Sequence, residues 1–471
     1  MLATAALIFV LQAFISRYLF WDSYYALVAG RHIAAHGIPS VEVLTTASKP
    51  GWIDQPWLAH WLFYQAWSIG GYVALASFSA ILVTLGFTLL AGLMVSRGVP
   101  GPRAFFWALA AFGVALGGTV VRAQSFSLAL AVIVLWVILD DSDSPRFRAR
   151  FLLVVPVLAL WANLHGSVAL WAAAVVAYCI GRATLQLMRG RWRSGIPYAF
   201  TSVAAGLAVL ATPYGAHVID YYVEVLGNSS VRQYIAEWAA PALGSPYSVA
   251  FFVMLGATSL IVLYGLVRGN RPPALLLAGA IGLAVLALTG VRFQVWFGIV
   301  ASVLAADVLG QLHSRPAPPA PVTLRRIGAI GLAACAAIGI VALITTSDAQ
   351  FERDLPLIAM AATATYATDH PGDEILADEL ASALMWLHPE TEGRIGFDTR
   401  LGQYSEEGLL SWFSYLNGVS PGWPGATDGY DVLLASAVDR PGLVERLSTL
   451  AGFSTLAAET KGAAFVRDGS R

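Results

Sequence analysis

A carboxylate and two phenols follow the first apolar run of this sequence. Asp22 comes directly after that run, beside Tyr24 and Tyr25. Position alone leaves two interpretations open, because a carboxylate there either caps the next helix by accepting amide hydrogens or belongs to a binding site. A carboxylate can take a proton from a hydroxyl group, and an arginine can stabilise a departing phosphate. The types of residue therefore indicate a reaction in which a nucleophile displaces a phosphate.

Other ionisable and amide side chains lie at the ends of apolar runs or in the loops between them. They are Arg31, Glu42, Asp54, His60, Arg122, Gln124, Asn163, His165, Arg232, Glu237 and Arg292. Each alone has a structural explanation, such as an arginine that extends from a helix end to the interface or a polar pair between helices. Ionisable groups at membrane depth are costly, so a set of them on one side is typical of a substrate site.

The composition is that of a membrane protein. Hydrophobic residues make up 57% of the chain and charged residues 12%, about half the charged share of an ordinary soluble domain. The net charge of -1 and the lack of a basic block beside stacking aromatics exclude nucleic acid as a partner. Cys179 and Cys335 both lie in apolar runs, where we expect them to pack as small apolar residues.

Apolar runs long enough to cross a hydrocarbon layer of about 30 Å recur along the first three quarters of the chain. We expect eleven spans, and each must be helical because lipid cannot satisfy a bare backbone. They are Leu2 to Phe20, Tyr72 to Val95, Ala104 to Val121, Ala123 to Leu139, Phe151 to Asn163, Gly166 to Leu187, Tyr198 to Thr212, Tyr247 to Val267, Pro273 to Thr289, Phe293 to Leu309 and Ile327 to Thr345. A tight hairpin at Asn163 to His165 separates the fifth and sixth.

Loop charge sets the orientation, since cytoplasmic loops collect Lys and Arg. Thirteen arginines fall in one set of alternate loops, and only five basic residues fall in the other. The first set is Arg97, Arg103, Arg146, Arg148, Arg150, Arg189, Arg191, Arg193, Arg268, Arg271, Arg315, Arg325 and Arg326; the second is Arg31, Lys49, Arg122, Arg232 and Arg292. We therefore place the chain in the inner or plasma membrane with a cytoplasmic N-terminus, and expect the polar candidates on the extracytoplasmic side.

The first external loop, residues 21–71, holds five of the fifteen tryptophans, a residue that favours the headgroup layer. Ser23 to His36 has the spacing of an amphipathic helix that ends at Gly37. A second such helix runs from Pro56 to Gly70, with Trp57 to Trp67 along the interface. The loop therefore predicts two helices that lie on the outer membrane surface.

Several segments of the sequence resemble a known family. The segments are "WDSYYALVAGRHIAAHGIP", "WIDQPWLAHWLFYQAWSIGG", "RAQSFSLAL", "WANLHGSVALW", "TPYGAHVIDYY", "AEWAAP" and "VRFQVWFGI". They are similar to bacterial GT-C membrane glycosyltransferases related to the protein O-mannosyltransferase and aminoarabinose transferase group. The similar segments run through most of the membrane portion, residues 1–346.

The resemblance implies an enzyme that transfers a sugar from a polyprenyl-phosphate donor to a glycan, lipid or protein acceptor outside the cytoplasm, with inversion. It makes Asp22 the general base on the acceptor hydroxyl or a metal ligand. The chain departs from the family pattern at Glu42, where relatives have Asp, and at Ala123, where relatives often have Pro. The sugar and the acceptor do not follow from the resemblance.

Metal use stays open at this stage. The sequence has no His/Cys spacing of a zinc site, and the resemblance allows a divalent ion such as Mg²⁺ or Mn²⁺ without requiring one. If an ion binds, Asp22 with Asp54, Glu42 or Glu237 supplies the oxygen ligands that such ions prefer.

After Thr346 the composition becomes that of a soluble domain, residues 347–471, which the topology places outside the membrane. Short apolar segments alternate with helical ones, which predicts a small α/β domain. Expected strands are Glu374 to Ala377, Arg394 to Asp398, Val432 to Ala435, Phe453 to Ala458 and Ala463 to Val466; expected helices are Glu379 to Leu387 and Leu443 to Leu450. No Gly-rich nucleotide fingerprint accompanies them.

Two other functions also need many spans with polar residues, namely a lipid-sugar flippase or transporter and a non-catalytic scaffold for envelope assembly. Transporters tend to place charges near the midplane and to have internal repeats. This sequence has no detectable repeat, and its polar groups lie at span ends, which favours the transferase. That hypothesis requires Asp22 and the later arginines to share one pocket.

Overall fold

The computed structural model describes residues 1–471 apart from 141–150, 228–234, 313–321, 419–421 and 470–471. The chain divides into two compact units. Residues 1–18, 73–215 and 236–346 form the first, called here the helical unit, and residues 19–72, 216–235 and 347–471 form the second, called the mixed unit. The first external loop therefore belongs to the same compact unit as the C-terminal region.

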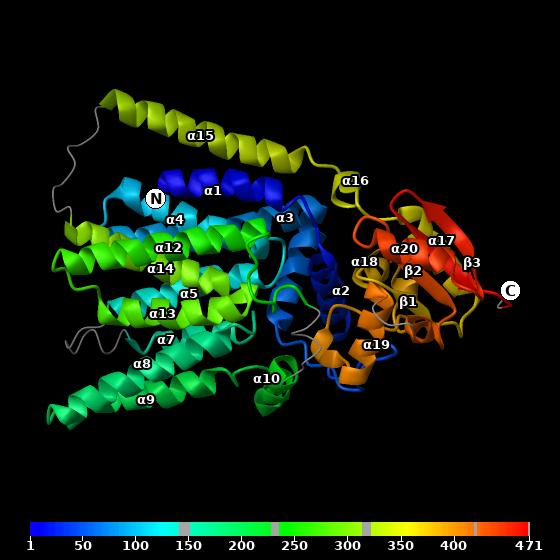
Figure 1. The fold of residues 1–471 in the computed structure, drawn as a ribbon, viewed down its shortest axis with the longest axis horizontal. Coiled ribbons are helices and arrows are strands. Elements are labelled where there is room, and N and C mark those ends of the chain that lie inside the picture. The colour runs from blue at the N-terminus through cyan, green and yellow to red at the C-terminus, as the bar shows by residue number, and fades with distance from the viewer. Residues whose placement is uncertain (141–150, 228–234, 313–321, 419–421, 470–471) are drawn as a thin grey trace. The chain divides into compact units, whose positions relative to one another are not determined.

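Packed helices make up the helical unit (Figure 1). They are α1 (Leu2–Ile15), the second half of α3 (Trp57–Ser96), α4 (Gly101–Ala115), α5 (Gln124–Leu139), α7 (Val154–Trp161), α8 (Val168–Met188), α9 (Trp192–Ala208), α12 (Pro246–Val267), α13 (Ala274–Thr289), α14 (Gln294–Leu312) and α15 (Val322–Ile344), with short 3-10 turns η1 (Leu116–Gly118) and η3 (Val291–Phe293). Helix α14 packs against α4, α12 and α13, and it buries Trp296, Phe297 and Leu304 in the core.

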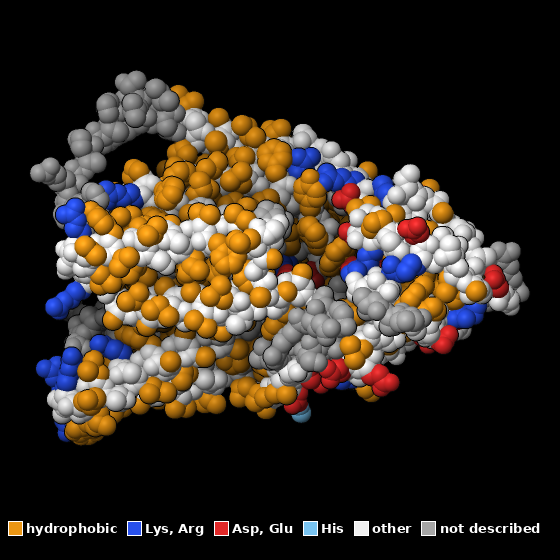
Figure 2. Space-filling model, viewed as in Figure 1, with side chains coloured by type: hydrophobic (Ala, Val, Ile, Leu, Met, Phe, Trp, Pro, Cys, Tyr) orange, Lys and Arg blue, Asp and Glu red, His pale blue; other side chains and the backbone are white. Residues whose placement is uncertain are grey.

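Each of the eleven apolar runs contains a helix. Within the part of the chain that the structure describes, four helices are long and apolar enough to cross a membrane, at Trp57–Ser96, Val168–Met188, Ser248–Val267 and Val291–Gln311. Hydrophobic side chains cover much of the visible outer surface of the unit (Figure 2), as expected where helices meet lipid rather than water. The break between α7 and α8 confirms two helices in place of one long helix, while the total number of spans stays a prediction.

A mixed four-stranded sheet forms the centre of the C-terminal region, where the sequence predicts a small α/β domain with five strands. Its strand order is β1-β2-β4-β3, with β1 parallel to β2 and the other pairs antiparallel. The strands are β1 (Ile375–Ala377), β2 (Val432–Ser436), β3 (Phe453–Glu459) and β4 (Gly462–Arg467). The helices and turns of the C-terminal region are α16 (Asp348–Phe351), α17 (Leu357–Asp369), α18 (Ala381–Leu387), α19 (Glu406–Asn417), α20 (Pro441–Ser448), η4 (Pro389–Thr391), η5 (Leu401–Gln403) and η6 (Trp423–Thr427). The turn η2 (Gly215–His217) and the helix α10 (Val218–Gly227) come from an earlier segment of the chain.

The strand expected at Arg394 to Asp398 is wrong. Ile395 makes only isolated bridges, to Thr45 and Ile375. The chain then turns at Asp398, whose side chain accepts the backbone N–H of Arg400, and this turn ends the extended segment before a ladder can form.

The two helices predicted in the first external loop are present, and they lie in the mixed unit, although the sequence assigned the loop to the membrane portion, residues 1–346. Helix α2 (Trp21–His36) ends at Gly37, whose φ of 86° requires glycine. Helix α3 is interrupted by non-helical backbone at Gly70 and Gly71. At Gly30 an added Cβ would lie 2.3 Å from the carbonyl oxygen of His60, so α2 and the first half of α3 pack at a distance that only glycine permits. Their position on the membrane surface stays a prediction.

Candidate functional site

Asp22 is the second residue of α2 and does not cap it. The N-cap position is Phe20, whose backbone N–H donates to the hydroxyl of Ser23 at 3.2 Å. The Asp22 side chain is partly exposed and lies in the first turn, where the free N–H groups and the helix dipole favour a negative charge. Asp22 therefore lies in the first turn of α2, while Phe20 holds the N-cap position.

The two tyrosines after Asp22 are buried hydrogen-bond donors. Tyr24 donates to the carbonyl oxygen of Phe351 at 3.4 Å, and Tyr25 donates to Asp54 Oδ1 at 3.3 Å. Burial is the main cause that raises the pKa of both phenols well above the ordinary value. Both hydroxyls therefore stay protonated at neutral pH.

Asp54 and His60 form a buried pair at the start of α3. Asp54 Oδ1 lies 2.9 Å from Nδ1 of His60, and the ring of Tyr25 meets the imidazole edge-on with centroids 5.1 Å apart. A carboxylate at Nδ1 fixes the proton on that nitrogen and orients the ring. The arrangement can position an imidazole, and all three side chains come from the first external loop.

Glu42 is held by Arg400 from the C-terminal region. The Arg400 guanidinium donates to Glu42 at 2.5 Å (Nη1 to Oε2) and 3.0 Å (Nη2 to Oε1), and its Nε donates to Asp398 at 2.7 Å. Glu42 Oε1 also accepts the backbone N–H groups of Leu44 and Thr45. Exposed fractions are 8% for Arg400, 5% for Glu42 and 0% for Asp398. We call Arg400, Glu42 and Asp398 the Arg400 network.

Aromatic rings and a phenol complete the surroundings of Arg400. Its guanidinium lies 4.9 Å from the ring centroid of Trp52 and 5.6 Å from that of Tyr25, and Asp398 Oδ1 accepts the hydroxyl of Tyr404 at 2.8 Å. Burial lowers the pKa of Arg400, but Asp398 and the other nearby anionic groups more than offset this, and the net pKa is raised. The guanidinium is therefore charged at any working pH.

Arg31 joins α2 to α18. Its guanidinium pairs with Glu392 at 2.7 Å, donates to the carbonyl oxygens of Met385 and Trp386, and lies 4.9 Å from the Trp386 ring centroid. Through these contacts the Arg31 side chain fixes α2 against the C-terminal region.

The second group of candidates lies in the helical unit, at the N-terminal ends of α5 and α14. Arg122, just before α5, forms an ion pair with Glu237, with Nη2 to Oε2 at 3.4 Å and a closer contact between Nη1 and Oε1. The backbone N–H of Arg292 donates to the carbonyl oxygen of Glu237 at 3.0 Å. The Arg292 guanidinium lies 3.9 Å from the centroid of the Trp238 ring.

His165, in the turn between α7 and α8, also interacts electrostatically with Glu237. Its Nδ1 accepts the backbone N–H of Ser167 at 3.1 Å, so a neutral imidazole carries its proton on Nε2. Burial raises the pKa of Glu237, but the charge and hydrogen bond of Arg122, with a smaller contribution from Arg292, more than offset this, and the net pKa is below the usual value. We call Arg122, His165, Glu237 and Arg292 the Glu237 cluster.

The side chains of Gln124 and Asn163 pack and hydrogen-bond within the helical unit. The Asn163 amide donates to the carbonyl oxygens of Ala159 and Ala211, both at 2.8 Å, which ties the α7–α8 turn to the end of α9. Gln124 is buried against Gly118, where an added Cβ would lie 3.3 Å from Gln124 Oε1. Arg232 lies outside the described residues. Among those residues, no three His, Cys, Asp or Glu side chains gather as a metal site requires.

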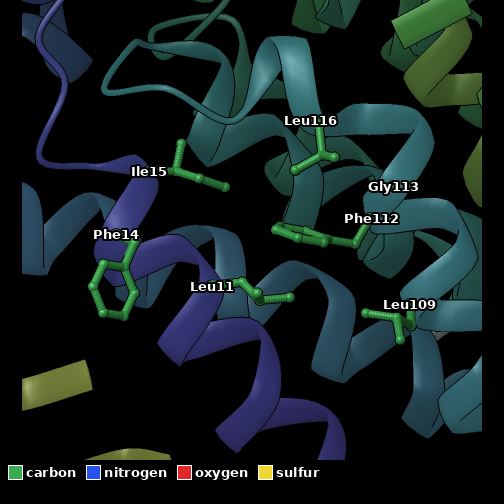
Figure 3. A pocket seen from close by; sticks show the side chains of 7 residues that line it. All are labelled: Leu11, Phe14, Ile15, Leu109, Phe112, Gly113 and Leu116. Atoms are coloured by element: carbon green, nitrogen blue, oxygen red, sulfur yellow. The ribbon is translucent and has the colours of Figure 1, made fainter. Parts of the chain in front are cut away.

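An apolar hollow of 490 Å³ lies between α1 and α4 of the helical unit (Figure 3). Its lining residues are Leu11, Phe14, Ile15, Leu109, Phe112, Gly113 and Leu116. None of these side chains is polar, so the hollow has room for hydrocarbon and offers no group for chemistry.

Sequence reasoning missed two residues that organise these groups, Arg400 and Asp398. Arg400 and Asp398 lie in "IGFDTRLGQYSEEG", the densest polar segment of the C-terminal region, and that density was the available signal. Trp238 adjoins Glu237 in the sequence, but nothing there indicates that its ring carries the Arg292 guanidinium. The pairing of residues so far apart along the chain needs the fold.

No protein-family model matches this chain, and no curated protein matches it in sequence. Solved structures share its fold. The oligosaccharyltransferase of Archaeoglobus fulgidus, in the apo form, has a TM-score of 0.55 and 12% identity, over 92% of this chain and 69% of that one. The same enzyme, AglB, in complex with an inhibitory peptide and a dolichol-phosphate gives 0.53 and 13%, with equal coverage.

A third structure is a variant of the arabinofuranosyltransferase AftD from Mycobacteria, with a TM-score of 0.52 and 14% identity. The match covers 99% of this chain and 41% of AftD. These enzymes are glycosyltransferases of the GT-C superfamily, and the fold of this chain is the GT-C fold. The resemblance seen in the sequence is thereby confirmed at the level of fold.

Proposed function

We propose that this protein transfers a sugar from a polyprenyl-phosphate donor to an acceptor hydroxyl outside the cytoplasm, with inversion at the anomeric carbon. The observation that carries the proposal is the Glu237 cluster, in which Arg122, Arg292 and His165 all act on one anionic position. Guanidinium groups at a fixed place suit the phosphate that leaves in such a transfer. The AglB structure with dolichol-phosphate supports a lipid phosphate as the group bound.

In the proposed reaction Asp22 takes the proton of the acceptor hydroxyl. The acceptor oxygen forms a bond to the anomeric carbon while the bond from that carbon to the phosphate oxygen breaks. The electron pair of the broken bond leaves with the polyprenyl phosphate, whose negative charge Arg122 and Arg292 stabilise. Entry of the nucleophile opposite the leaving group inverts the configuration. None of these steps requires a metal ion.

The remaining candidates of the mixed unit are assigned to positioning. Glu42 and Asp54 already accept hydrogen bonds from Arg400, His60 and Tyr25. We propose that they hold the first external loop in the shape that presents Asp22. Arg31 serves the same purpose through α18.

The proposal includes about eleven spans, a cytoplasmic N-terminus and an extracytoplasmic C-terminal region. Arginine side chains gather at the end of the helical unit that holds the α8–α9 and α12–α13 turns (Figure 2). Arg271 precedes α13 and Arg292 follows it, so these two lie at opposite ends of one helix. The bias of basic residues supports a cytoplasmic position for the first end and an outer position for the Glu237 cluster.

The test is Asp22→Asn in purified protein, incubated with a radiolabelled polyprenyl-phosphate sugar and membrane acceptors. Loss of the general base should slow transfer roughly 100- to 10,000-fold, with membrane insertion unchanged. Asp220→Asn is the matched control, because Asp220 is an exposed carboxylate of α10 beside His217, and it should keep full transfer.

Full activity of Asp22→Asn would remove Asp22 from the mechanism. Translocation of the labelled lipid by the wild type without transfer would instead support the flippase, and neither activity would support the scaffold.

A further inference from the structure

We propose that the Glu237 carboxylate occupies the place of the donor's phosphate in the unliganded protein and is displaced when a polyprenyl monophosphate binds. The inference rests on the proposed function and adds a role for one residue: Glu237 competes with the lipid phosphate and so promotes release of the polyprenyl phosphate left after transfer.

The contact geometry matches such a competitor. Glu237 meets Arg122 through both Nη1 and Nη2, which is the two-point arrangement that guanidinium groups form with carboxylates and phosphates alike. A phosphate oxygen pair can therefore take the same two donors. The donor's phosphodiester and the phosphate monoester left after transfer both have such an oxygen pair, and the monoester carries the larger negative charge.

The charges around Glu237 exceed what one carboxylate neutralises. Two guanidinium groups, Arg122 and Arg292, act on it together with His165, and the pKa of Glu237 falls as a result. A phosphate monoester carries up to two negative charges near neutral pH. It can thus replace the carboxylate with a gain in attraction to the same cations.

Glu237 is also free to leave its place without unfolding the segment that carries it. The main chain is held independently, because Glu237 and Ala239 accept backbone N–H groups of Arg292 and Val291 at 3.0 and 3.1 Å. The side chain is 41% exposed, against 17% for Arg122. Solvent and ligand can therefore reach the carboxylate, and its movement leaves the backbone hydrogen bonds intact.

The experiment measures binding of undecaprenyl phosphate in detergent micelles to the full-length protein. Glu237→Gln should bind about tenfold more tightly than wild type, which corresponds to about 1.4 kcal/mol of removed competition. Glu224→Gln is the matched control, since Glu224 is equally exposed at 41% and pairs with Lys49; it should bind as wild type does. Glu237→Asp, which keeps the charge on a shorter side chain, should show a smaller gain and covers the case in which Glu237→Gln does not fold.

Further measurements test whether the tighter binding of Glu237→Gln depends on Arg122 and on the phosphate group of the ligand. In an Arg122→Gln background, Glu237→Gln should confer a smaller gain, because the cation that meets Glu237 at two points is gone and only Arg292 remains. Undecaprenol, which has no phosphate, should bind equally to wild type and to Glu237→Gln. Inorganic phosphate tests the phosphate without the lipid, and a gain seen there but absent with undecaprenyl phosphate would overturn the assignment to a lipid.

If Glu237→Gln and Glu237→Asp both bind undecaprenyl phosphate as wild type does, or more weakly, the inference is overturned while the proposed function still stands. An equal gain with undecaprenol, or a gain that is undiminished without Arg122, would also overturn the inference. Absence of undecaprenyl phosphate binding in wild type and in every variant would overturn the proposed function itself.

Discussion

Two arginine–carboxylate pairs in this protein have the same chemistry and different surroundings. In the mixed unit Arg400 meets Glu42 and Asp398 with at most 8% of any side chain exposed. In the helical unit Arg122 meets Glu237, and the carboxylate is 41% exposed. The first pair is enclosed by the rings of Trp52 and Tyr25, whereas the second is accessible to solvent.

The difference separates a structural ion pair from a candidate ligand site. A buried pair that loses one partner leaves an uncompensated charge, which is strongly destabilising. A partly exposed pair contributes less to stability than an enclosed one, so a ligand can open it at a smaller cost. The same residue types thus hold the fold in one unit and remain available for binding in the other.

The largest expected effect comes from removing the cation of the Arg400 network. Arg400→Gln should lower the free energy of unfolding by about 3–5 kcal/mol, because Glu42 and Asp398 then remain buried without their partner. Thermal unfolding of the detergent-solubilised protein, followed by circular dichroism, measures this loss as a lower midpoint.

The control for that variant removes the stranded charges as well. Glu42→Gln and Asp398→Asn added to Arg400→Gln should restore part of the midpoint, since the amide of Gln still accepts from Leu44 and Thr45. If the triple variant is no more stable than Arg400→Gln, the stranded charge is not the cause of the loss.

An intermediate effect is expected at the exposed pair. Arg122→Gln should change the free energy of unfolding by less than about 1 kcal/mol, yet weaken binding of undecaprenyl phosphate by at least roughly tenfold, as expected when a charged hydrogen bond is lost. Isothermal binding and thermal unfolding on the same preparation measure both quantities. A variant with a large stability loss and unchanged binding would reverse the comparison between the two pairs.

Local patterns in the sequence predicted several elements of the mixed unit. The apolar spacing of Ser23 to His36 and the following Gly37 gave α2, and alternation of short apolar segments gave β2, β3 and β4 within one or two residues. These features depend on neighbours along the chain. The sequence placed Arg122, His165 and Arg292 on a common side of the membrane, and the transferase hypothesis required the arginines to share one pocket with Asp22.

The partners of each charge depended on contacts between distant segments. Glu42 and Arg400 are 358 residues apart, and no local pattern indicates which of many arginines meets a given carboxylate. Burial was equally inaccessible, because Glu42 and Glu237 look alike in sequence, as single carboxylates among apolar residues. Only the fold distinguishes the enclosed one from the exposed one.

The smallest expected effect is a pH dependence at the exposed pair. The pKa of Glu237 is lowered in the folded protein. Burial raises this pKa, but the charge of Arg122 lowers it by more than burial raises it. A carboxylate with a depressed pKa adds stability above its unfolded pKa, about 4.3, and this contribution is lost as the pH falls through the folded value. The difference in unfolding midpoint between wild type and Glu237→Gln should therefore be small at pH 6 and vanish toward pH 3, because groups common to both proteins cancel. A difference that stays constant over that range would show that the charge of Glu237 does not contribute, and that the pair is weaker than its geometry indicates.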